Sequence, residues 1–203
     1  MGADGEVMIG ARRAFGILNG PRDARGIVVF AHGSGSSRLS PRSAFAAACL
    51  HESGFLTLLF DLLSGAEAAD SGHLFDRALL GQRVWEAIDW LDGQPAAQPL
   101  PLGQFGASTG AAKSRARCRL ARREARLGRR GAGASSSADV VVRWRMDFEV
   151  LALNRRAMEA LRCVTTLSVV LGAGHLFEEE GTLEEALAAA CDGFRIHLGD
   201  AHD

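Results

Sequence analysis

The chain has 203 residues, which suits one domain, and its 47% hydrophobic and 23% charged residues are typical of a globular protein and exclude global disorder. No apolar run reaches the roughly 18 residues needed to cross a bilayer, and the first residues lack the basic flank and apolar stretch of a secretion signal. The four cysteines show no C-x-x-C pairing, which indicates buried or incidental thiols in a reducing compartment. We therefore expect a single cytoplasmic domain over residues 1–203, without membrane contact.

Two short apolar runs in the first third of the chain predict buried strands. Residues 26–31 and 55–60 are uninterrupted and rich in Val, Leu and Phe, as in parallel strands that are covered on both faces. The turn signal at residues 19–21 predicts a hairpin between residues 14–18 and the run at 26–31. An alanine-rich helix is expected over residues 45–53.

The next part of the chain continues the alternation of strands and helices. Residues 62–73 are rich in Gly, Ala and Asp and predict a loop long enough to be a lid or a substrate-facing segment. Apolar residues at spacings of three and four predict an amphipathic helix over residues 74–91, with Trp85 and Trp90 packed against the sheet. A proline-marked loop at 94–101 leads into another strand. This alternation predicts an α/β fold with a mostly parallel sheet.

The segment Gly106-Ala107-Ser108-Thr109-Gly110 fits the pattern G-x-S-x-G. This pattern is typical of a serine on a tight turn between a strand and a helix, where glycine avoids the clash that a Cβ would cause. Ser108 is therefore a candidate nucleophile, and the alternative is an ordinary turn serine.

A second glycine-rich loop, His32-Gly33-Ser34-Gly35-Ser36-Ser37, follows the run at 26–31. It matches neither the P-loop pattern nor G-x-G-x-x-G, which disfavours phosphate binding. It suits a loop that donates a backbone N–H to the oxyanion of an ester intermediate, and a plain tight turn is the alternative. For His32, a role in shaping this loop is favoured over a role as the catalytic base.

The middle of the chain departs from this pattern. Nine of the 23 Lys and Arg residues fall within residues 113–130, with Glu124 the only acid among them, and residues 128–138 have the composition of a flexible linker. So many charges cannot all be buried, so residues 113–138 are expected to form an atypical basic insert or replacement. The basic run could meet nucleic acid, but it lacks interleaved aromatic residues, so a solvated face is favoured.

Regular elements return at the end of the chain. Residues 139–144 and 166–171 predict strands, residues 151–161 a helix, and residues 183–197 a final helix with one apolar face. Asp147 follows the first of these strands, and His175 follows the second in a glycine-rich loop. Because polar residues after parallel strands gather at one edge of the sheet, the order Ser108, Asp147, His175 matches nucleophile, acid and base. The alternatives are a helix N-cap for Asp147 and a loop histidine for His175.

Five segments of the sequence resemble the α/β-hydrolase superfamily and, within it, the dienelactone-hydrolase-like branch. They are residues 28–37, 58–61, 105–110, 151–155 and 172–177. The resemblance implies a three-layer α/β-hydrolase-like fold, Ser108 as nucleophile, His175 as general base and then acid, and Asp147 as its partner. It also implies oxyanion donors in the backbone N–H groups of Ser34 and Thr109, a small ester or lactone as substrate, and no cofactor. The remaining histidines, His51, His73, His197 and His202, show no metal-ligand spacing, so no metal is expected.

The chain also departs from that family between Ala112 and Asp147. Its members usually hold two strands there, whereas this interval is short and basic, which predicts that one strand-helix unit after the serine turn is missing or distorted. Two explanations of the short, basic interval stay open: a locally altered reading frame, and a real loss of one strand-helix unit. Glu149 is then a substitute for Asp147 as the acid. A member of the fold that binds ligands without catalysis is the rival interpretation, and the sequence leaves the oligomeric state open.

Overall fold

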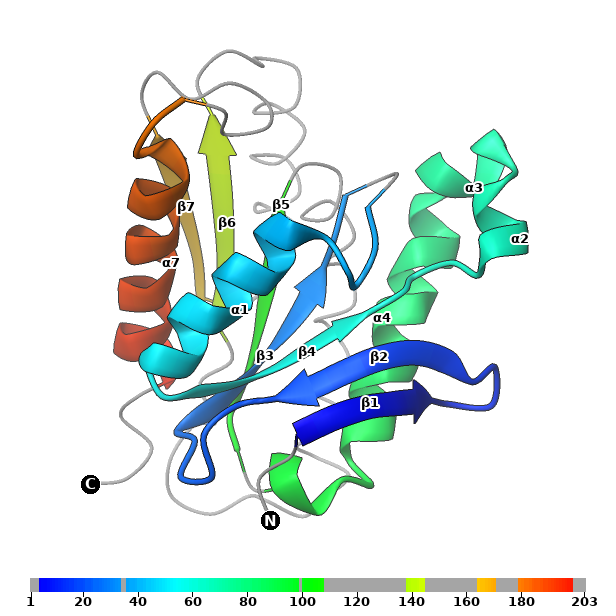
Figure 1. Ribbon diagram of the computed structural model, residues 1–203, viewed down its shortest axis with the longest axis horizontal. Coiled ribbons are helices and arrows are strands. Elements are labelled where there is room, and N and C mark those ends of the chain that lie inside the picture. The colour runs from blue at the N-terminus through cyan, green and yellow to red at the C-terminus, as the bar shows by residue number, and fades with distance from the viewer. Residues whose placement is uncertain are drawn as a thin grey trace.

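The computed structural model describes residues 4–33, 36–98, 100–107, 138–144, 164–170 and 179–198. Its strands form one seven-stranded sheet in the order β1-β2-β4-β3-β5-β6-β7 (Figure 1). The strands are β1 (Asp4–Ile9), β2 (Ala14–Asn19), β3 (Gly26–Ala31), β4 (Phe55–Phe60), β5 (Leu102–Ala107), β6 (Ala138–Trp144) and β7 (Val164–Val170). The helices are α1 (Pro41–Glu52), α2 (Gly65–Ala68), α3 (Ser71–Phe75), α4 (Arg77–Leu91), the 3-10 turn η1 (Pro95–Ala97) and α7 (Thr182–Leu198).

The sheet is mostly parallel and lies between two layers of helices. Strands β3 to β7 run parallel to one another, whereas β2 pairs antiparallel with both β1 and β4. Helices α1 and α7 cover one face, and α4 covers the other (Figure 1). The expected three-layer, mostly parallel α/β architecture is therefore confirmed.

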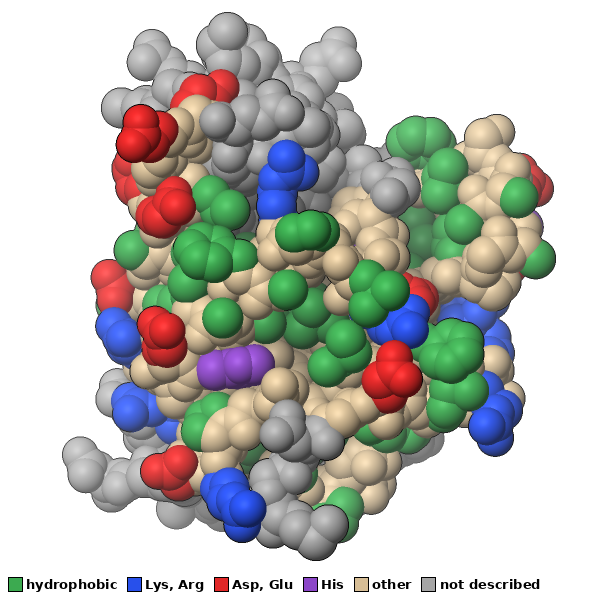
Figure 2. Space-filling view, in the orientation of Figure 1, with side chains coloured by type: hydrophobic (Ala, Val, Ile, Leu, Met, Phe, Trp, Pro, Cys, Tyr) green, Lys and Arg blue, Asp and Glu red, His purple; other side chains and the backbone are tan. Residues whose placement is uncertain are grey.

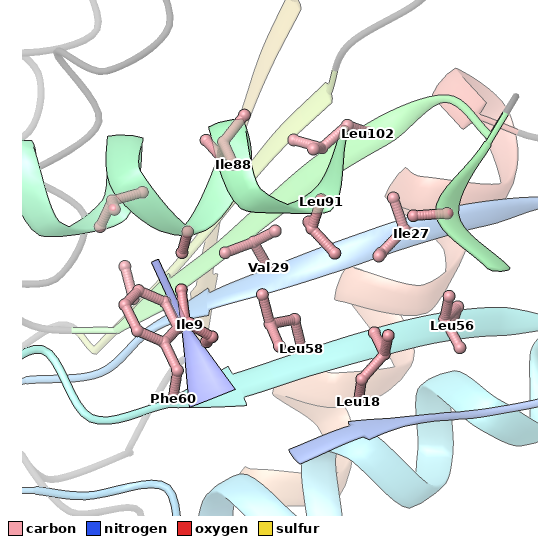
Figure 3. Close-up of a cluster of buried hydrophobic side chains, with 14 of the residues drawn as sticks. Ile9, Leu18, Ile27, Val29, Leu56, Leu58, Phe60, Ile88, Leu91 and Leu102 are labelled. Atoms are coloured by element: carbon pink, nitrogen blue, oxygen red, sulfur yellow. The ribbon is translucent and has the colours of Figure 1, made fainter. Parts of the chain in front are cut away.

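Alternating side chains of the two central strands supply both cores. Val28 and Phe30 of β3 pack with α1 and α7, whereas Ile27 and Val29 pack on the side of α4. Leu58 of β4 belongs to the α4 side, where Figure 3 shows it beside Val29 and close to the α4 residues. Burying each such side chain contributes about 1.5–3 kcal/mol. The uninterrupted apolar runs predicted from the sequence are thus explained by burial on both faces.

The final helix packs as its apolar pattern predicts. Leu187, Ala190, Cys191, Phe194 and Leu198 are buried on one face of α7. Glu184 and Glu185 lie in its first turn, and Arg195 lies in its last turn, so each charge suits the nearby end of the helix dipole. Trp85 and Trp90 of α4 are partly buried against the other core, as expected.

The predicted hairpin is wrong. Strand β2 does not pair with β3, because β4 lies between them in the sheet. The hairpin instead joins β2 to β1, through a turn in which Gly10 and Arg13 have φ values of 62° and 53°. Strand β1 was not predicted, since only three of its residues, Val7, Met8 and Ile9, are strongly apolar.

The segment after β4 is also more ordered than predicted. Residues 62–73 were expected to form a loop, but they contain α2 and most of α3. Ser64 and Glu67 form a capping box at the start of α2, and Asp70 caps α3 through the backbone N–H of Gly72. Short local hydrogen bonds therefore fold a segment whose composition suggests a loop.

Two of the cysteines lie in the described part of the chain, and both are free thiols. Cys191 is buried and Cys49 is half-buried, and the Cys191 Sγ lies 3.7 Å from the Cys49 carbonyl oxygen. Burial, followed by the nearness of Cys191 and Glu52, raises the pKa of the Cys49 thiol. Both therefore behave as the packing thiols that the sequence predicts, whereas Cys118 and Cys163 lie outside the described residues.

Between β5 and β7, the residues that the structure describes contain one strand, β6. It pairs in parallel with β5 on one side and with β7 on the other. The expected loss or distortion of one strand-helix unit stays a prediction, because residues 108–137 and 145–163 lie outside the described residues. The basic residues 113–137 and the helix expected at 151–161 lie outside the described residues.

Candidate functional site

The candidate site is defined by where the parallel strands end. Strands β3, β5, β6 and β7 run in the same direction, so their carboxyl ends meet at one edge of the sheet (Figure 1). In the sequence, Ser108 directly follows β5, while Asp147 follows β6 and His175 follows β7. The strand before each candidate residue therefore leads to the same edge.

The candidate side chains themselves lie outside the described residues. This holds for Ser108, Asp147 and His175, for the oxyanion residues Ser34 and Thr109, and for Glu149. Their roles stay predictions. The structure describes the elements that lead to them and the loop residues that surround them.

Strand β5 is paired within the sheet up to Ala107, the residue before Ser108. Phe105 lies opposite Phe30 of β3 in the sheet, and their ring centroids are 5.1 Å apart. Such tilted aromatic pairs add about 0.5–1.5 kcal/mol beyond the area they bury. The pair fastens the strand that leads to Ser34 to the strand that leads to Ser108.

Gly103 lets α7 approach the same strand closely. A Cβ at this position would lie 2.6 Å from Phe194 Cε1 and 2.8 Å from Leu198 Cδ1, both on α7. Phe194 and Leu198 are fully buried, so neither ring nor methyl group has space to retreat. Glycine is therefore required here by packing, and it sets the distance between β5 and the helix that follows the His175 loop.

His32 joins two loops at the candidate edge. Its Nδ1 lies 2.9 Å from the Gly33 carbonyl oxygen, and its Nε2 lies 3.3 Å from the backbone N–H of Leu62. Because a carbonyl only accepts and an N–H only donates, one neutral tautomer satisfies both, with the proton on Nδ1. The ring thus links the loop after β3 to the loop after β4, which supports its predicted role in shaping the loop.

Asp61, the first residue after β4, binds Arg38 in the loop that precedes α1. Its carboxylate accepts from the backbone N–H of Arg38 at 2.8 Å and from the Arg38 guanidinium at 2.6 Å. The same guanidinium lies 5.0 Å from the ring centroid of Phe15. Asp61 was included in the segment 58–61 of the family resemblance, but Arg38 was missed, since no sequence pattern signals a pair 23 residues apart.

A network of four charged side chains fixes the segment with α2 and α3. Glu67 of α2 pairs with Arg83 of α4 at 2.8 Å and with Arg12 of the β1–β2 turn at 3.2 Å. Glu86 of α4 pairs with the same two arginines. No sequence pattern signals this network, although the capping box of Ser64 and Glu67 is visible in the sequence as S-x-x-E.

The network lowers the pKa values of both carboxyl groups. The backbone N–H of Ser64 is the main reason that the pKa of Glu67 falls to about 2, assisted by the Ser64 hydroxyl and the two arginines. Burial raises the pKa of Glu86, but the hydrogen bond from Arg12 and the charges of Arg83 and Arg12 outweigh it, so its pKa is lowered. Both groups are therefore ionised near neutral pH, and this arrangement suits a fixed support better than a proton donor.

In the described residues, no helix combines the length and apolar character that a membrane crossing requires. The sequence matches no protein-family profile.

Solved structures resemble the chain over nearly its whole length. The dienelactone hydrolase from Anabaena variabilis is 34% identical, with a TM-score of 0.80 and coverage of 98% of each chain. A dienelactone hydrolase-like promiscuous phosphotriesterase from metagenomic libraries is 19% identical, with a TM-score of 0.69 over 96% of this chain and 98% of its own. The second likeness shows the fold alone, whereas the first extends to the sequence.

The curated relatives carry a name that refers to a different activity from that of the solved structures. Proteins from two strains of Mycobacterium tuberculosis, provisionally named phosphoribosyl transferase, are 43% identical over 95% of this chain. The match covers 46% of those proteins, so the chain spans about half the length of the curated relatives it matches.

Proposed function

The chain belongs to the dienelactone-hydrolase-like branch of the α/β-hydrolases, and on that premise we propose that it is a serine hydrolase acting on a small carboxylic ester or lactone. The observation that carries the proposal is the 34% identity to a dienelactone hydrolase over 98% of both chains. The parallel strands support it, because those that precede Ser108, Asp147 and His175 end at one edge of the sheet.

In the proposed reaction, the Ser108 hydroxyl attacks the substrate carbonyl while His175 accepts its proton. The backbone N–H groups of Ser34 and Thr109 stabilise the negative oxygen of the tetrahedral intermediate. His175 then protonates the departing alkoxide, which leaves an acyl group on Ser108.

Water completes the cycle. His175 removes a proton from a water molecule, which attacks the acyl group and releases the carboxylic acid and the free Ser108 hydroxyl. In a lactone the departing alcohol stays attached to the acyl chain, so one hydroxy acid is the product. Asp147, or Glu149 in its place, orients the His175 ring, and the reaction consumes no cofactor.

We infer that the name phosphoribosyl transferase refers to the part of the curated relatives that lies outside the match. The matched part is about half of those proteins, and it is the part similar to this chain, which itself resembles a dienelactone hydrolase. A transferase activity of the whole relative then resides in the half that this chain does not contain. We expect this chain to release no pyrophosphate from phosphoribosyl pyrophosphate in the presence of purine or pyrimidine bases.

The test of the hydrolase is labelling with a fluorophosphonate probe, which reacts covalently with activated serines. We expect labelling of the wild-type chain and of Ser43→Ala, a matched change on α1, but none of Ser108→Ala. Hydrolysis of p-nitrophenyl acetate should follow the same order. Equal labelling of Ser108→Ala and the wild type would exclude Ser108 as the nucleophile.

A catalytically impaired protein of the same fold, which binds a ligand without cleaving it, is the second candidate. It is favoured by the atypical basic composition of residues 113–138, which follow the Ser108 turn where the family usually has an apolar helix. Absence of labelling in a wild-type chain that unfolds cooperatively would support this candidate.

A further inference from the structure

Two successive residues after β4 bind the two ends of the glycine-rich loop that follows β3. At the first end, the backbone N–H of Leu62 donates to the His32 Nε2 at 3.3 Å. At the other end, the backbone N–H of Arg38 donates to the Asp61 Oδ1 at 2.8 Å. Residues 33–37, which include the candidate oxyanion donor, lie between these two contacts in the sequence. The loop is thus attached at both ends to the segment that ends β4.

The contact at the far end, which we call the Arg38–Asp61 pair, uses both oxygens of one carboxylate. While Oδ1 accepts from the Arg38 backbone, Oδ2 accepts from the Arg38 Nη1 at 2.6 Å. Both side chains are mostly covered, with 15% of Arg38 and 21% of Asp61 exposed, so salt and water screen their attraction little. Because one of the two bonds is made by the main chain, the pair fixes the backbone at residue 38 and not only a side chain.

Strand β2 supports both members of the pair through Phe15. The backbone N–H of Asp61 donates to the Phe15 carbonyl oxygen at 2.9 Å, and the Arg38 guanidinium lies 5.0 Å from the centre of the Phe15 ring. In Figure 2, basic, acidic and hydrophobic side chains lie together over the end of β4 and the beginning of β2. Arg38 also pairs with Glu6 at 3.4 Å, but Glu6 is 72% exposed, so this contact adds little. The Arg38–Asp61 pair is therefore built on the sheet.

The described hydrogen bonds inside the loop are local turns. The backbone N–H of Ser36 donates to the Gly33 carbonyl oxygen at 3.3 Å, and that of Ser40 donates to the Ser37 carbonyl oxygen at 3.1 Å. Such turns shape a loop, but they do not fix its position relative to a neighbouring strand. That position depends on contacts with other elements, and the bonds at residues 32 and 38 are of this kind.

We propose that Asp61 and Arg38 are positioning residues, which hold the glycine-rich loop where its backbone can stabilise the oxyanion. The proposal rests on the proposed hydrolase function, in which the backbone N–H of Ser34 binds the negative oxygen. His32 holds the near end of the loop, and the Arg38–Asp61 pair holds the far end. A displacement of about 1 Å at a catalytic group can lower the rate about 10²-fold. The role assigned to the pair includes no contact with the reacting atoms and no proton transfer.

The first test compares the hydrolysis of p-nitrophenyl acetate by Asp61→Asn and by the wild type. Asparagine keeps one oxygen for the Arg38 backbone N–H, but its NH₂ group would face the guanidinium, which also only donates. We expect kcat to fall about 10- to 100-fold and KM to change less than about twofold, because an oxyanion donor acts on the transition state. The pH profile should keep its shape, since no proton carrier is changed.

The second variant, Arg38→Met, separates the two bonds of the pair. It removes the guanidinium and keeps the backbone N–H, so its kcat should fall less than that of Asp61→Asn. In the double variant the amide oxygen can accept this N–H while its NH₂ group no longer faces a guanidinium. The double variant should therefore be no slower than Arg38→Met alone. Losses that multiply in the double variant would overturn the proposal, because the two residues would then act independently.

Thr57→Val is the matched control for a loss of stability. Thr57 lies on β4 too, is fully buried, and bonds to the His51 ring at 2.8 Å and to the Asn19 carbonyl oxygen at 3.3 Å. Its replacement should lower the melting temperature while kcat stays within about twofold of the wild type. A fall in kcat as large as that of Asp61→Asn would mean that lost stability alone explains both results, and would overturn the proposal.

Hydrogen exchange measured by mass spectrometry tests the hold on the loop without any substrate. Residues 32–40 should exchange faster in Asp61→Asn than in the wild type, whereas the peptides of α1 should exchange equally in both. Equal exchange of residues 32–40 would overturn the proposal whatever the kinetics show, and so would faster exchange with an unchanged kcat. If the wild type cleaves no ester, the proposed function and the catalytic role of the pair both fail, while the exchange rates still decide whether the pair holds the loop.

Discussion

The Arg83 guanidinium donates a 2.8 Å hydrogen bond to the Glu67 carboxylate and thereby joins α4 to α2. Glu67 also accepts from the backbone N–H of Ser64 at 2.8 Å, so one carboxylate caps its own helix and anchors it to a neighbour. Arg83 is well buried, with 10% of its side chain exposed. The position of the segment after β4, which borders the candidate edge, therefore depends on this contact.

Glu67→Gln should lower the free energy of unfolding by about 1–2 kcal/mol, because hydrogen bonds to a charged partner are replaced by weaker neutral ones. Urea denaturation of the two proteins measures the difference. Glu52→Gln changes an exposed carboxylate at the end of α1 and serves as the control, with an expected change near zero. Equal effects of both substitutions would contradict the role of Glu67 as an anchor.

The same carboxylate gives stability a definite pH dependence. The pKa of Glu67 is lowered from 4.5 to about 2, so its stabilising effect is fully present above pH 4.5 and is lost as the pH falls towards 2. The difference in unfolding free energy between wild type and Glu67→Gln should therefore be constant from pH 7 to pH 5 and shrink below pH 4.5. Urea titrations at several pH values measure it, and a difference that grows on acidification would contradict the assignment.

Gly103→Ala should destabilise the protein by about 1–3 kcal/mol, because its methyl group would overlap the Phe194 ring and the Leu198 side chain. The matched control is Gly65→Ala at the start of α2, where a Cβ would meet no atom within 4 Å. That change should leave stability unchanged or raise it by about 0.4–1 kcal/mol. Thermal and urea unfolding of both variants measure these changes in stability. If Gly103→Ala is as stable as the wild type, α7 can move away from β5.

His32→Asn should reduce ester hydrolysis without changing the shape of its pH profile. The ring donates to Gly33 and accepts from Leu62, so its loss loosens the loop that precedes Ser34 and removes no proton carrier. We expect kcat to fall while the acidic limb of the profile, assigned to His175, keeps its midpoint. If His32 is itself the base, the acidic limb will disappear in the variant.

Local sequence patterns were sufficient to predict an element where its residues are buried continuously along its length. The runs that became β3 and β4 are buried at all six positions, and the apolar face of α7 follows from the helical repeat. Burial decides such elements almost independently of their neighbours. The same patterns correctly predicted that strands and helices alternate.

Pairing between strands was harder to predict, because it depends on elements distant in the sequence. β4 separates β2 from β3, and nothing in residues 14–31 reveals it. The contacts of Arg38 with Asp61 and of Glu67 with Arg83 likewise join side chains that no periodicity connects. For the candidate site, the sequence predicted the order of the residues and the edge to which their strands lead, and it predicted His32 as a loop-shaping residue.

The bond from the Leu62 amide to the His32 imidazole restricts how the substrate range of this protein can be engineered. Grafting a foreign segment in place of residues 62–76 is an obvious way to alter what enters the site. The imidazole requires a backbone donor at the first grafted position, and proline has none. A library that begins the graft with proline would therefore disturb the neighbouring glycine-rich loop before any new side chain could act.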